Sequence, residues 1–309
     1  MNKRDLKNLH DLNREDIQNI LDMAADLKHK RGNRLNHLGG KSVGLLFQKP
    51  SNRTRVSFEV GIWELGGNCI YLGPEEINLG KRESVHDVAK TLSRYLSTIV
   101  ARTFYQKDIE ELAHHASVPV INGLSDLYHP CQALTDIFSI REKIGDLKGK
   151  TVAFIGDGNN VCHSLLLACA KVGTNVRAAC PKGYQPDQEI VAAAKEIAGQ
   201  NGSEIVISQS PKEAAKDAHV LYGDVWISMG QEKEMKKRLK VFKPYQINAD
   251  LAHEADTNFI FMHCLPAHRE QEVTTEIIDG KHSIVFDQAE NRLHVQKAVL
   301  LCLMQGAKS

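Results

Sequence analysis

The sequence lacks several features that would place it in a specialised class of protein. Its seven cysteines are scattered, odd in number and never in a CxxC pair, which argues against a disulfide framework and a structural zinc site. It has almost no net charge, since 39 Lys and Arg offset 38 Asp and Glu to leave +1. We therefore expect no long-range attraction to nucleic acid or an anionic membrane. No apolar run approaches the ~18 residues of a membrane span, and residues 1–12 lack the apolar core of a signal peptide. These absences favour a cytoplasmic protein.

What remains is the composition of an ordinary globular protein, with 309 residues, 42% of them hydrophobic and 25% charged. Such a chain buries a core without disulfides or metals. Helical spacing of apolar residues is found around 14–27, 56–63, 85–95, 130–144, 165–170 and 187–198. The short apolar runs that read as strands are 42–47, 69–72, 98–101, 151–155, 175–179, 204–208, 220–221, 258–262 and 284–286.

Strands alternating with helices predict an α/β fold, here two doubly wound parallel-sheet domains. We place the boundary in the helix 130–144, which gives a first domain of residues 1–140 and a second of residues 141–287. Ligands of such sheets bind at the carboxyl ends of the strands. The active site is therefore expected in the cleft between the domains.

The most informative segment is Ser51-Asn52-Arg53-Thr54-Arg55, which lies between a predicted strand and a predicted helix. A helix N-terminus presents unpaired N–H groups and the positive end of the helix dipole, which together suit a phosphate. The hydroxyls of Ser51 and Thr54 add donors, and the arginines offer planar forks. Two arginines oppose the dipole unless an anion is present, so anion binding is favoured over a solvated basic first turn.

Two further segments carry weaker signals. His129-Pro130-Cys131-Gln132 puts Pro130 at a favourable first helical position, with an imidazole and an amide on either side. Gly156-Asp157-Gly158-Asn159-Asn160-Val161 resembles a dinucleotide loop, but the third glycine is replaced by Val161 and no acidic residue follows the next strand. We therefore reject NAD binding, and interpret Asn159 and Asn160 as amide donors for a carboxylate.

Three segments near strand ends or helix starts complete the set. Asp224, in Asp-Val-Trp-Ile-Ser-Met-Gly, follows a strand and could bind an ammonium group or simply form a turn. Cys264, in His-Cys-Leu-Pro-Ala-His-Arg, could be a nucleophile, a metal ligand, a polarisable group against an amine or an inert buried thiol. Arg292 lies in Glu-Asn-Arg at the start of the C-terminal helix.

Taken in order, the segments SNRTR, HPCQ, GDGNNV, DVWISMG, HCLPAHR and AENRLHVQKA resemble the transcarbamoylase family, and within it the members that act on ornithine. The resemblance covers nearly the whole chain. It implies a carbamoyl-phosphate domain, an ornithine domain, a C-terminal helix of residues 288–309 that returns to the first domain, and a homotrimer. It further implies formation of citrulline and phosphate from carbamoyl phosphate and L-ornithine, without metal or cofactor, in arginine biosynthesis rather than breakdown.

The resemblance also assigns roles to residues. Those implied to act in catalysis are Arg102, His129, Cys264 and Arg292. Those implied to bind carbamoyl phosphate are Ser51, Asn52, Arg53, Thr54, Asn78, Arg102, His129, Gln132, Cys264, Leu265 and Arg292. Those implied to bind ornithine are Asn160, Asp224, Ser228 and Met229.

The chain departs from the family pattern at a few positions. Asn52 replaces the usual threonine, Asn78 a frequent glutamine, Lys81-Arg82 a common Arg-Gly, and Gly223 a usual threonine. Three alternatives stay open. The acceptor could be putrescine, aspartate or an acylated ornithine; the protein could bind carbamoyl phosphate without turning it over; or Cys264 and a histidine could form a hydrolase.

Overall fold

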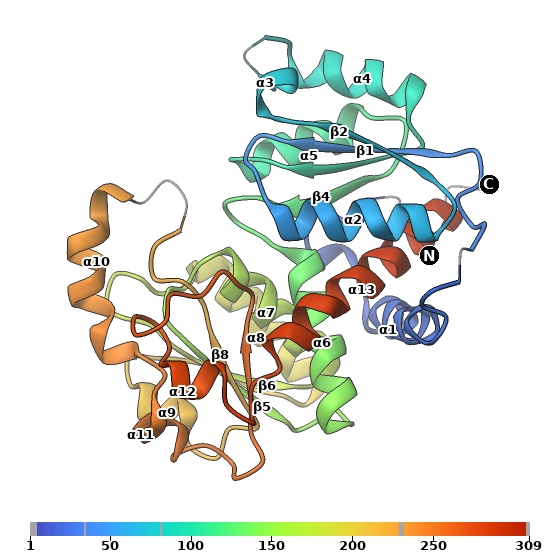
Figure 1. Cartoon of the computed structure of the whole chain (residues 1–309). Helices are drawn as coiled ribbons and strands as arrows, with labels where there is room; N and C mark the ends of the chain where they lie inside the picture. The colour runs from blue at the N-terminus through green and yellow to red at the C-terminus, as the bar shows by residue number, and fades with distance from the viewer. Residues whose placement is uncertain (1–4, 34, 81, 229–231, 307–309) are drawn as a thin grey trace. The chain divides into compact units, whose positions relative to one another are not determined.

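The computed structural model describes residues 5–33, 35–80, 82–228 and 232–306. The chain divides into two compact units, one formed by Met1–Phe138 with Glu290–Ser309 and the other by Ser139–Ala289. Each unit contains one sheet in which all paired strands are parallel (Figure 1). The predicted fold class, two α/β domains with parallel sheets, is confirmed.

The sheet of the first unit has the order β2-β1-β3-β4. Its strands are β1 (Ser42–Phe47), β2 (Asn68–Leu72), β3 (Thr98–Arg102) and β4 (Val120–Leu124). From β1 the chain adds β2 on one side and β3 on the other, so β1 and β3 flank the switch point where α/β sheets bind ligands. The Gln48 N–H, just after β1, donates to the Arg102 carbonyl at 2.8 Å, which joins the two strand ends there.

Helices cover both faces of this first sheet. Those of the first unit are η1 (Leu9–Asp11), α1 (Arg14–His29), α2 (Asn52–Glu64), α3 (Pro74–Ile77), α4 (Val85–Tyr95) and α5 (Gln106–His115). In Figure 1, α4 and α2 lie on opposite faces. Helix α13 (Val285–Gly306) packs on α2 at Gly61, where a Cβ would lie only 3.0 Å from Cγ of Lys297. The absent side chain therefore permits this close approach.

The sheet of the second unit has the order β7-β6-β5-β8-β9, with its switch point between β5 and β8. Its strands are β5 (Thr151–Ile155), β6 (Asn175–Ala179), β7 (Ile205–Ser208), β8 (Val220–Gly223) and β9 (Ile260–His263). Its helices are α6 (Pro130–Ile144, shared with the first unit), α7 (Asn160–Val172), α8 (Gln188–Asn201), α9 (Pro211–Ala215), η2 (Glu232–Glu234), α10 (Met235–Phe242), η3 (Lys243–Tyr245), α11 (Ala249–Ala252) and α12 (Thr275–Ile278).

Some sequence-based expectations fail. The predicted strand 284–286 is wrong, because α13 begins at Val285 and only Ser283 forms an isolated bridge to Phe261. An apolar run of three residues does not distinguish a strand from the first turn of a buried helix. Val56, Val60 and Trp63 do share a face of α2, but that face is exposed. Strand β4 and helix α5 were not anticipated.

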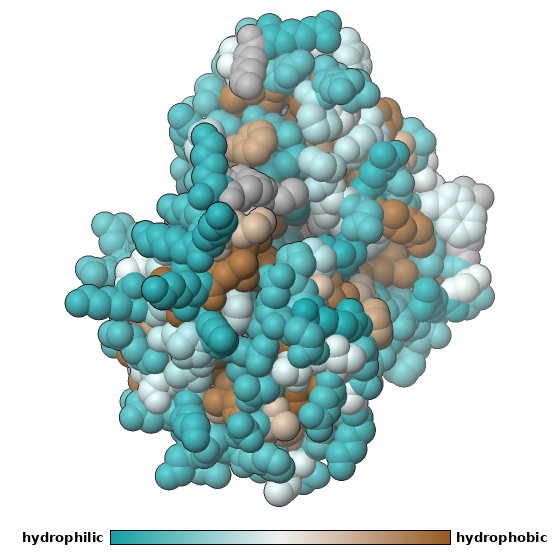
Figure 2. Space-filling model, turned by 60° about the vertical axis from the view of Figure 1, so that its left-hand side comes forward, coloured by the Kyte–Doolittle hydropathy of each residue, from teal (hydrophilic) through white to brown (hydrophobic). Residues whose placement is uncertain are grey.

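Among the helices within the described ranges, none is both long and apolar enough to cross a bilayer. Hydrophilic side chains cover most of the face shown in Figure 2, with apolar patches between them.

Candidate active site

The SNRTR segment forms the turn from β1 into α2 at the first switch point. Ser51 is the N-cap of α2, and its Oγ accepts from the Thr54 N–H at 3.3 Å and donates to Thr54 Oγ1 at 3.1 Å. Asn52 is exposed, and its Oδ1 accepts from the Arg53 N–H at 2.8 Å. The predicted helix N-terminus is therefore present, with one hydroxyl capping it and a second, from Thr54, fully buried behind.

Arg292, from α13, reaches this turn. Its Nη2 donates to Thr54 Oγ1 at 3.1 Å and its Nη1 donates to Gln132 Oε1 at 2.8 Å. All three side chains are buried. The structure thus joins α2, α6 and α13 through three residues that the sequence assigned to one site, and buries a guanidinium beside a helix N-terminus.

Two residues that the sequence analysis missed hold this group in place. Gln296, with its amide oxygen turned toward Arg292, accepts from Nε at 3.1 Å and from Nη2 at 2.9 Å, while its nitrogen donates to Ser57 Oγ at 2.6 Å. Asp136, one turn after Gln132 on α6, accepts from the Gln132 Nε2 at 2.8 Å. The i, i+4 spacing of Gln132 and Asp136 is the signal that could have revealed the second of these.

His129 lies in the same unit, just before α6, and is buried. Burial lowers its pKa well below the ordinary value, and the positive charges of Arg292, Arg102, Lys49 and Arg53 lower this pKa further. The imidazole is therefore neutral at pH 7 and can donate one hydrogen bond and accept another. Four cations act on this one residue, which makes the region a strong candidate for binding an anion.

Lys49 is a member of this cluster that the sequence analysis did not select. It is half-buried, and its Nζ lies 5.2 Å from the centroid of the Phe104 ring. Burial and the neighbouring Arg102 lower its pKa to about 8. Lys49 directly precedes the Pro-Ser-Asn-Arg-Thr-Arg turn, and this position could have identified it as a candidate from the sequence.

Asn78 is placed differently from the other residues assigned to carbamoyl phosphate. It is exposed at the C-terminus of α3 with φ of 38°, a left-handed conformation that asparagine tolerates. Its Nδ2 donates to the Glu75 carbonyl at 3.2 Å, within its own turn. The neighbouring Leu79 carbonyl accepts from Gln48 Nε2 at 3.4 Å, which links this loop to the end of β1.

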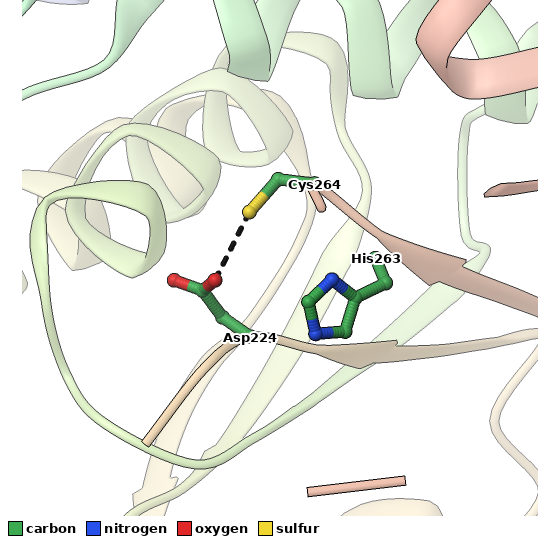
Figure 3. A group of neighbouring side chains, drawn as sticks. All are labelled: Asp224, His263 and Cys264. Atoms are coloured by element: carbon green, nitrogen blue, oxygen red, sulfur yellow. Dashed lines mark hydrogen bonds between the residues drawn. The ribbon is translucent and has the colours of Figure 1, made fainter. Parts of the chain in front are cut away.

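In the second unit, Asp224 directly follows β8 at the second switch point and is buried. Its Oδ2 accepts from Asn159 Nδ2 at 2.7 Å, and its Oδ1 accepts from Cys264 Sγ at 3.0 Å and from the Val225 N–H at 2.8 Å. Figure 3 shows Cys264 and Asp224 pointing toward each other from neighbouring strands. A buried carboxylate surrounded by neutral donors suits an ammonium ligand.

The two asparagines of the GDGNNV segment have different places. Asn159 is the N-cap of α7, accepting from the N–H groups of Val161 and Cys162 while it donates to Asp224. It therefore binds a carboxylate of the protein itself. Asn160, the residue assigned to ornithine, is the first residue of α7 and is half-buried.

His263 supports the turn that carries Cys264. Its Nδ1 accepts from the Leu265 N–H at 2.9 Å, and its Nε2 lies 3.3 Å from Oε1 of the buried Glu272. Leu265 has φ of 58°, a conformation that costs a residue with a side chain of order 1–3 kcal/mol. Glu272 and His263 were not selected from the sequence, yet His263 holds the backbone directly after the thiol.

Asp224, His263 and Cys264 each place one ligand atom within 4.8 Å of the others, the one such group found among the described residues. Binding of a metal ion by all three would compete with contacts already made. His263 Nδ1 already accepts a hydrogen bond from the Leu265 N–H. The Asp224 carboxylate already accepts from Asn159, from the Val225 N–H and from the thiol of Cys264.

A buried ion pair stabilises the loop after β8. Arg238, from α10, pairs with Asp157 in the loop after β5, and its Nε donates to the Trp226 carbonyl at 2.6 Å. Burial raises the pKa of Asp157 to about 6, with Arg238 opposing the shift and Asp224 adding to it. Ser228, assigned to ornithine, lies half-buried two residues beyond Trp226. Met229, assigned with it, falls outside the described residues.

Comparison with known families matches two domain models to consecutive parts of the chain. Residues 4–142 match the family model of the carbamoyl-P binding domain of aspartate/ornithine carbamoyltransferases, and residues 148–303 match that of the Asp/Orn binding domain. The chain belongs to this carbamoyltransferase family.

Individual members of the carbamoyltransferase family are similar over nearly the whole chain. The ornithine carbamoyltransferase of Bacillus subtilis is 52% identical over 99% of this chain and 95% of its own length. The solved structure of the Pyrococcus furiosus ornithine carbamoyltransferase has a TM-score of 0.95 at 50% identity, covering 98% of this chain and 97% of that one. The anabolic enzyme of Campylobacter jejuni has a TM-score of 0.92 at 36% identity, covering 97% and 99%.

Proposed function

We propose that this protein transfers the carbamoyl group of carbamoyl phosphate to the δ-amino group of L-ornithine, forming L-citrulline and phosphate. The observation that carries the proposal is the buried contact of Arg292 with Thr54 and Gln132 at a helix N-terminus surrounded by cations. The names of the similar proteins support it, since those compared are ornithine carbamoyltransferases.

Carbamoyl phosphate is bound by the first unit in this proposal. The N-terminus of α2 offers its N–H groups, and Ser51, Asn52, Arg53 and Thr54 supply donors to the phosphate. Arg102 ends β3 beside this turn and contacts both phosphate and carbonyl, while Asn78 closes from its loop. Asn52 has an amide in place of the family's usual hydroxyl, and an amide still donates.

Arg102, His129 and Arg292 polarise the carbonyl of the carbamoyl group. Charge develops on this oxygen as the tetrahedral intermediate forms, and preorganised donors stabilise it there. The neutral His129 donates one N–H without adding a charge to the cationic cluster. Gln132, Cys264 and Leu265 contact the amino side of the carbamoyl group.

Ornithine is bound by the second unit. Asp224 accepts the α-ammonium group, and Asn160, Ser228 and Met229 contact the amino-acid end. The thiol of Cys264 donates to Asp224 Oδ1 and borders the reacting δ-amine. Since an amine that has gained a proton is no nucleophile, the δ-amine reacts in its neutral form, which the nearby cations favour.

The reaction then proceeds without a group outside the protein and its substrates. The lone pair of the δ-nitrogen attacks the carbamoyl carbon, and the carbonyl π electrons move to oxygen. Collapse of this intermediate restores the carbonyl and breaks the carbon–oxygen bond to phosphate. The δ-nitrogen, now bonded to the carbamoyl carbon, loses one proton, and the departing phosphate takes it up. Atoms and charges therefore balance. Holding both substrates in place supplies the orientation.

The acceptor is tested by measuring citrulline and carbamoylated product formation with L-ornithine, putrescine, L-aspartate and N-acetyl-ornithine in parallel. Rapid turnover with ornithine alone is expected, and Arg53→Ala serves as the inactive blank. Arg94→Ala is the matched control, because Arg94 is an exposed arginine on α4. Turnover with another amine would overturn the roles of Asp224 and Ser228. Binding of carbamoyl phosphate with no turnover would favour a binding protein.

We further propose a cytoplasmic homotrimer that acts in arginine biosynthesis. The direction is supported by the anabolic designation of the Pyrococcus furiosus and Campylobacter jejuni relatives. The assembly is supported by an exposed apolar stripe on α2, where Val56 is 54% and Trp63 is 58% exposed, next to the edge strand β2. Light scattering after gel filtration is expected to give three chains for the native protein and fewer for Trp63→Glu. A native monomer would contradict this.

A further inference from the structure

The buried carboxylate of Asp136 has no place in the reaction described above. It lies on α6 one turn after Gln132, is fully buried, and accepts from Gln132 Nε2 at 2.8 Å. An ionised carboxylate is costly to bury unless donors surround it. The Gln132 amide donates to this carboxylate, so Asp136 is placed to act on the orientation of that amide.

The other end of the same amide meets a group of opposite character. Gln132 Oε1 accepts from Nη1 of Arg292 at 2.8 Å. A guanidinium can only donate, and an ionised carboxylate can only accept. The orientation of the Gln132 amide is thus determined at both ends, since reversing it would set the NH₂ against Arg292 and the oxygen against Asp136.

We infer that Asp136 is a positioning residue that holds the Gln132 amide with its oxygen toward the ligand, so that the site selects a carbamoyl NH₂ over an acyl CH₃. This rests on the proposed function, in which Gln132 contacts the carbamoyl group. An amide oxygen has two lone pairs. Arg292 takes one, and the other accepts from the carbamoyl nitrogen, whereas a methyl group of the same size leaves it without a donor.

The cost of that missing donor sets the expected selectivity. A buried acceptor without its donor costs about 1–3 kcal/mol, or roughly 5–150-fold in affinity. Without Asp136, only the contact with Arg292 opposes rotation of the amide, so its NH₂ faces the ligand part of the time and the distinction weakens. Selectivity between two ligands of equal shape is therefore the property that a merely structural role of Asp136 would leave unchanged.

The test uses two stable ligands that differ only at this group: phosphonoacetamide, which ends in NH₂, and 2-oxopropylphosphonate, which ends in CH₃. Calorimetric titration without ornithine gives the ratio of their dissociation constants. The native protein is expected to prefer phosphonoacetamide by roughly tenfold or more. Asp136→Val is expected to lower the ratio severalfold by weakening phosphonoacetamide binding alone, and Asp136→Asn, which keeps an acceptor oxygen, to give an intermediate ratio.

Thr135→Val is the matched control, since Thr135 is an equally buried neighbour whose Oγ1 donates to the Cys131 carbonyl at 2.7 Å. It is expected to keep the native ratio. The inference is overturned by an unchanged ratio in Asp136→Val or, if that variant does not fold, in Asp136→Asn. Equal loss of both ligands, or the same change in Thr135→Val, overturns it too. A native protein that binds neither phosphonate would instead refute the proposed function, and one that binds both equally would refute the inference alone.

Discussion

Arg292 donates to the hydroxyl of Thr54 across 3.1 Å, although the two residues are 238 positions apart in the chain. The contact connects the last helix of the protein with the first turn of α2, where the anion-binding segment lies. A single hydrogen bond thus couples the group proposed to polarise the carbonyl to the group proposed to bind the phosphate.

Removing the Thr54 hydroxyl is expected to weaken the use of carbamoyl phosphate. In Thr54→Val the Arg292 Nη2 and the Ser51 hydroxyl lose their common acceptor. An unsatisfied buried group costs about 1–3 kcal/mol, so kcat/KM for carbamoyl phosphate should fall roughly 5–150-fold. Thr54→Ser keeps the hydroxyl and should stay within about threefold of native. Equal kinetics for both variants would disprove the role of the hydroxyl.

Changing the Asp224 carboxylate is expected to affect only ornithine. Asp224→Asn removes the charge proposed to bind the α-ammonium group, and hydrogen bonds to charged groups contribute about 1.5–3 kcal/mol. The KM for ornithine should therefore rise roughly 10–150-fold while the KM for carbamoyl phosphate stays near native. Steady-state kinetics with each substrate varied in turn gives both constants.

Asp217→Asn is the control for this change, because Asp217 is an exposed aspartate in the same unit. Its backbone φ of 53° is one that asparagine accepts. A parallel rise in both Michaelis constants for Asp224→Asn would point to general damage and contradict the assignment.

Binding of carbamoyl phosphate is expected to be coupled to proton uptake at Lys49. Burial and Arg102 hold the pKa of this lysine at about 8. A bound anion favours the ammonium form and raises the pKa again, so at a pH near 8 the complex takes up protons. Calorimetry in two buffers of different ionisation enthalpy should give different apparent heats. Lys49→Met should abolish that difference, and a native heat that is the same in both buffers would exclude the coupling.

The stability of the protein is expected to carry a pH dependence from Asp157. Burial raises its pKa to about 6 in the folded state, opposed by Arg238 and increased by Asp224 and Glu234, against about 3.9 for a free aspartate. The folded state therefore binds more protons, and the contribution of Asp157 to stability is full below about pH 4 and is lost as the pH rises through about 6.

Urea unfolding of the native protein and of Asp157→Asn measures this contribution. Asparagine does not ionise, so Asp157→Asn serves as the reference. Relative to this variant, the free energy of unfolding of the native protein should fall by about 1 kcal/mol between about pH 5 and pH 7.5. A constant difference would show that Asp157 keeps an ordinary pKa in the folded state, and a change in the opposite direction would show a lowered one. Either result would contradict the prediction.

The positions of the candidate residues in the fold were predictable where the sequence carries local chemistry. Ser51, Thr54 and Arg102 lie at strand ends or helix starts, and a parallel sheet brings those ends to one edge. The neighbours that hold such residues in place were harder to find. Asp136, Gln296 and Glu272 act through side-chain contacts that helix packing and long loops create, and none of them belongs to a motif of its own.

The errors in the fold have physical causes of the same kind. Strand β4 was missed because Asn122 and Gly123 interrupt its apolar run. The stripe of Val56, Val60 and Trp63 has helical spacing, but the buried side of α2 is lined by Thr54, Phe58, Gly61 and Ile62. Helical periodicity identifies an apolar face of a helix, but it does not show whether that face packs against the protein's own core.

The most direct test of the account is the rate of citrulline formation from carbamoyl phosphate and L-ornithine by the native protein, Arg292→Ala and Arg94→Ala. Removal of one preorganised donor to a developing oxyanion typically costs about 10²–10³ in kcat. We predict rapid turnover by the native protein and Arg94→Ala, and a loss of that size in Arg292→Ala. Native turnover that Arg292→Ala retains, or no citrulline from the native protein, would contradict the account.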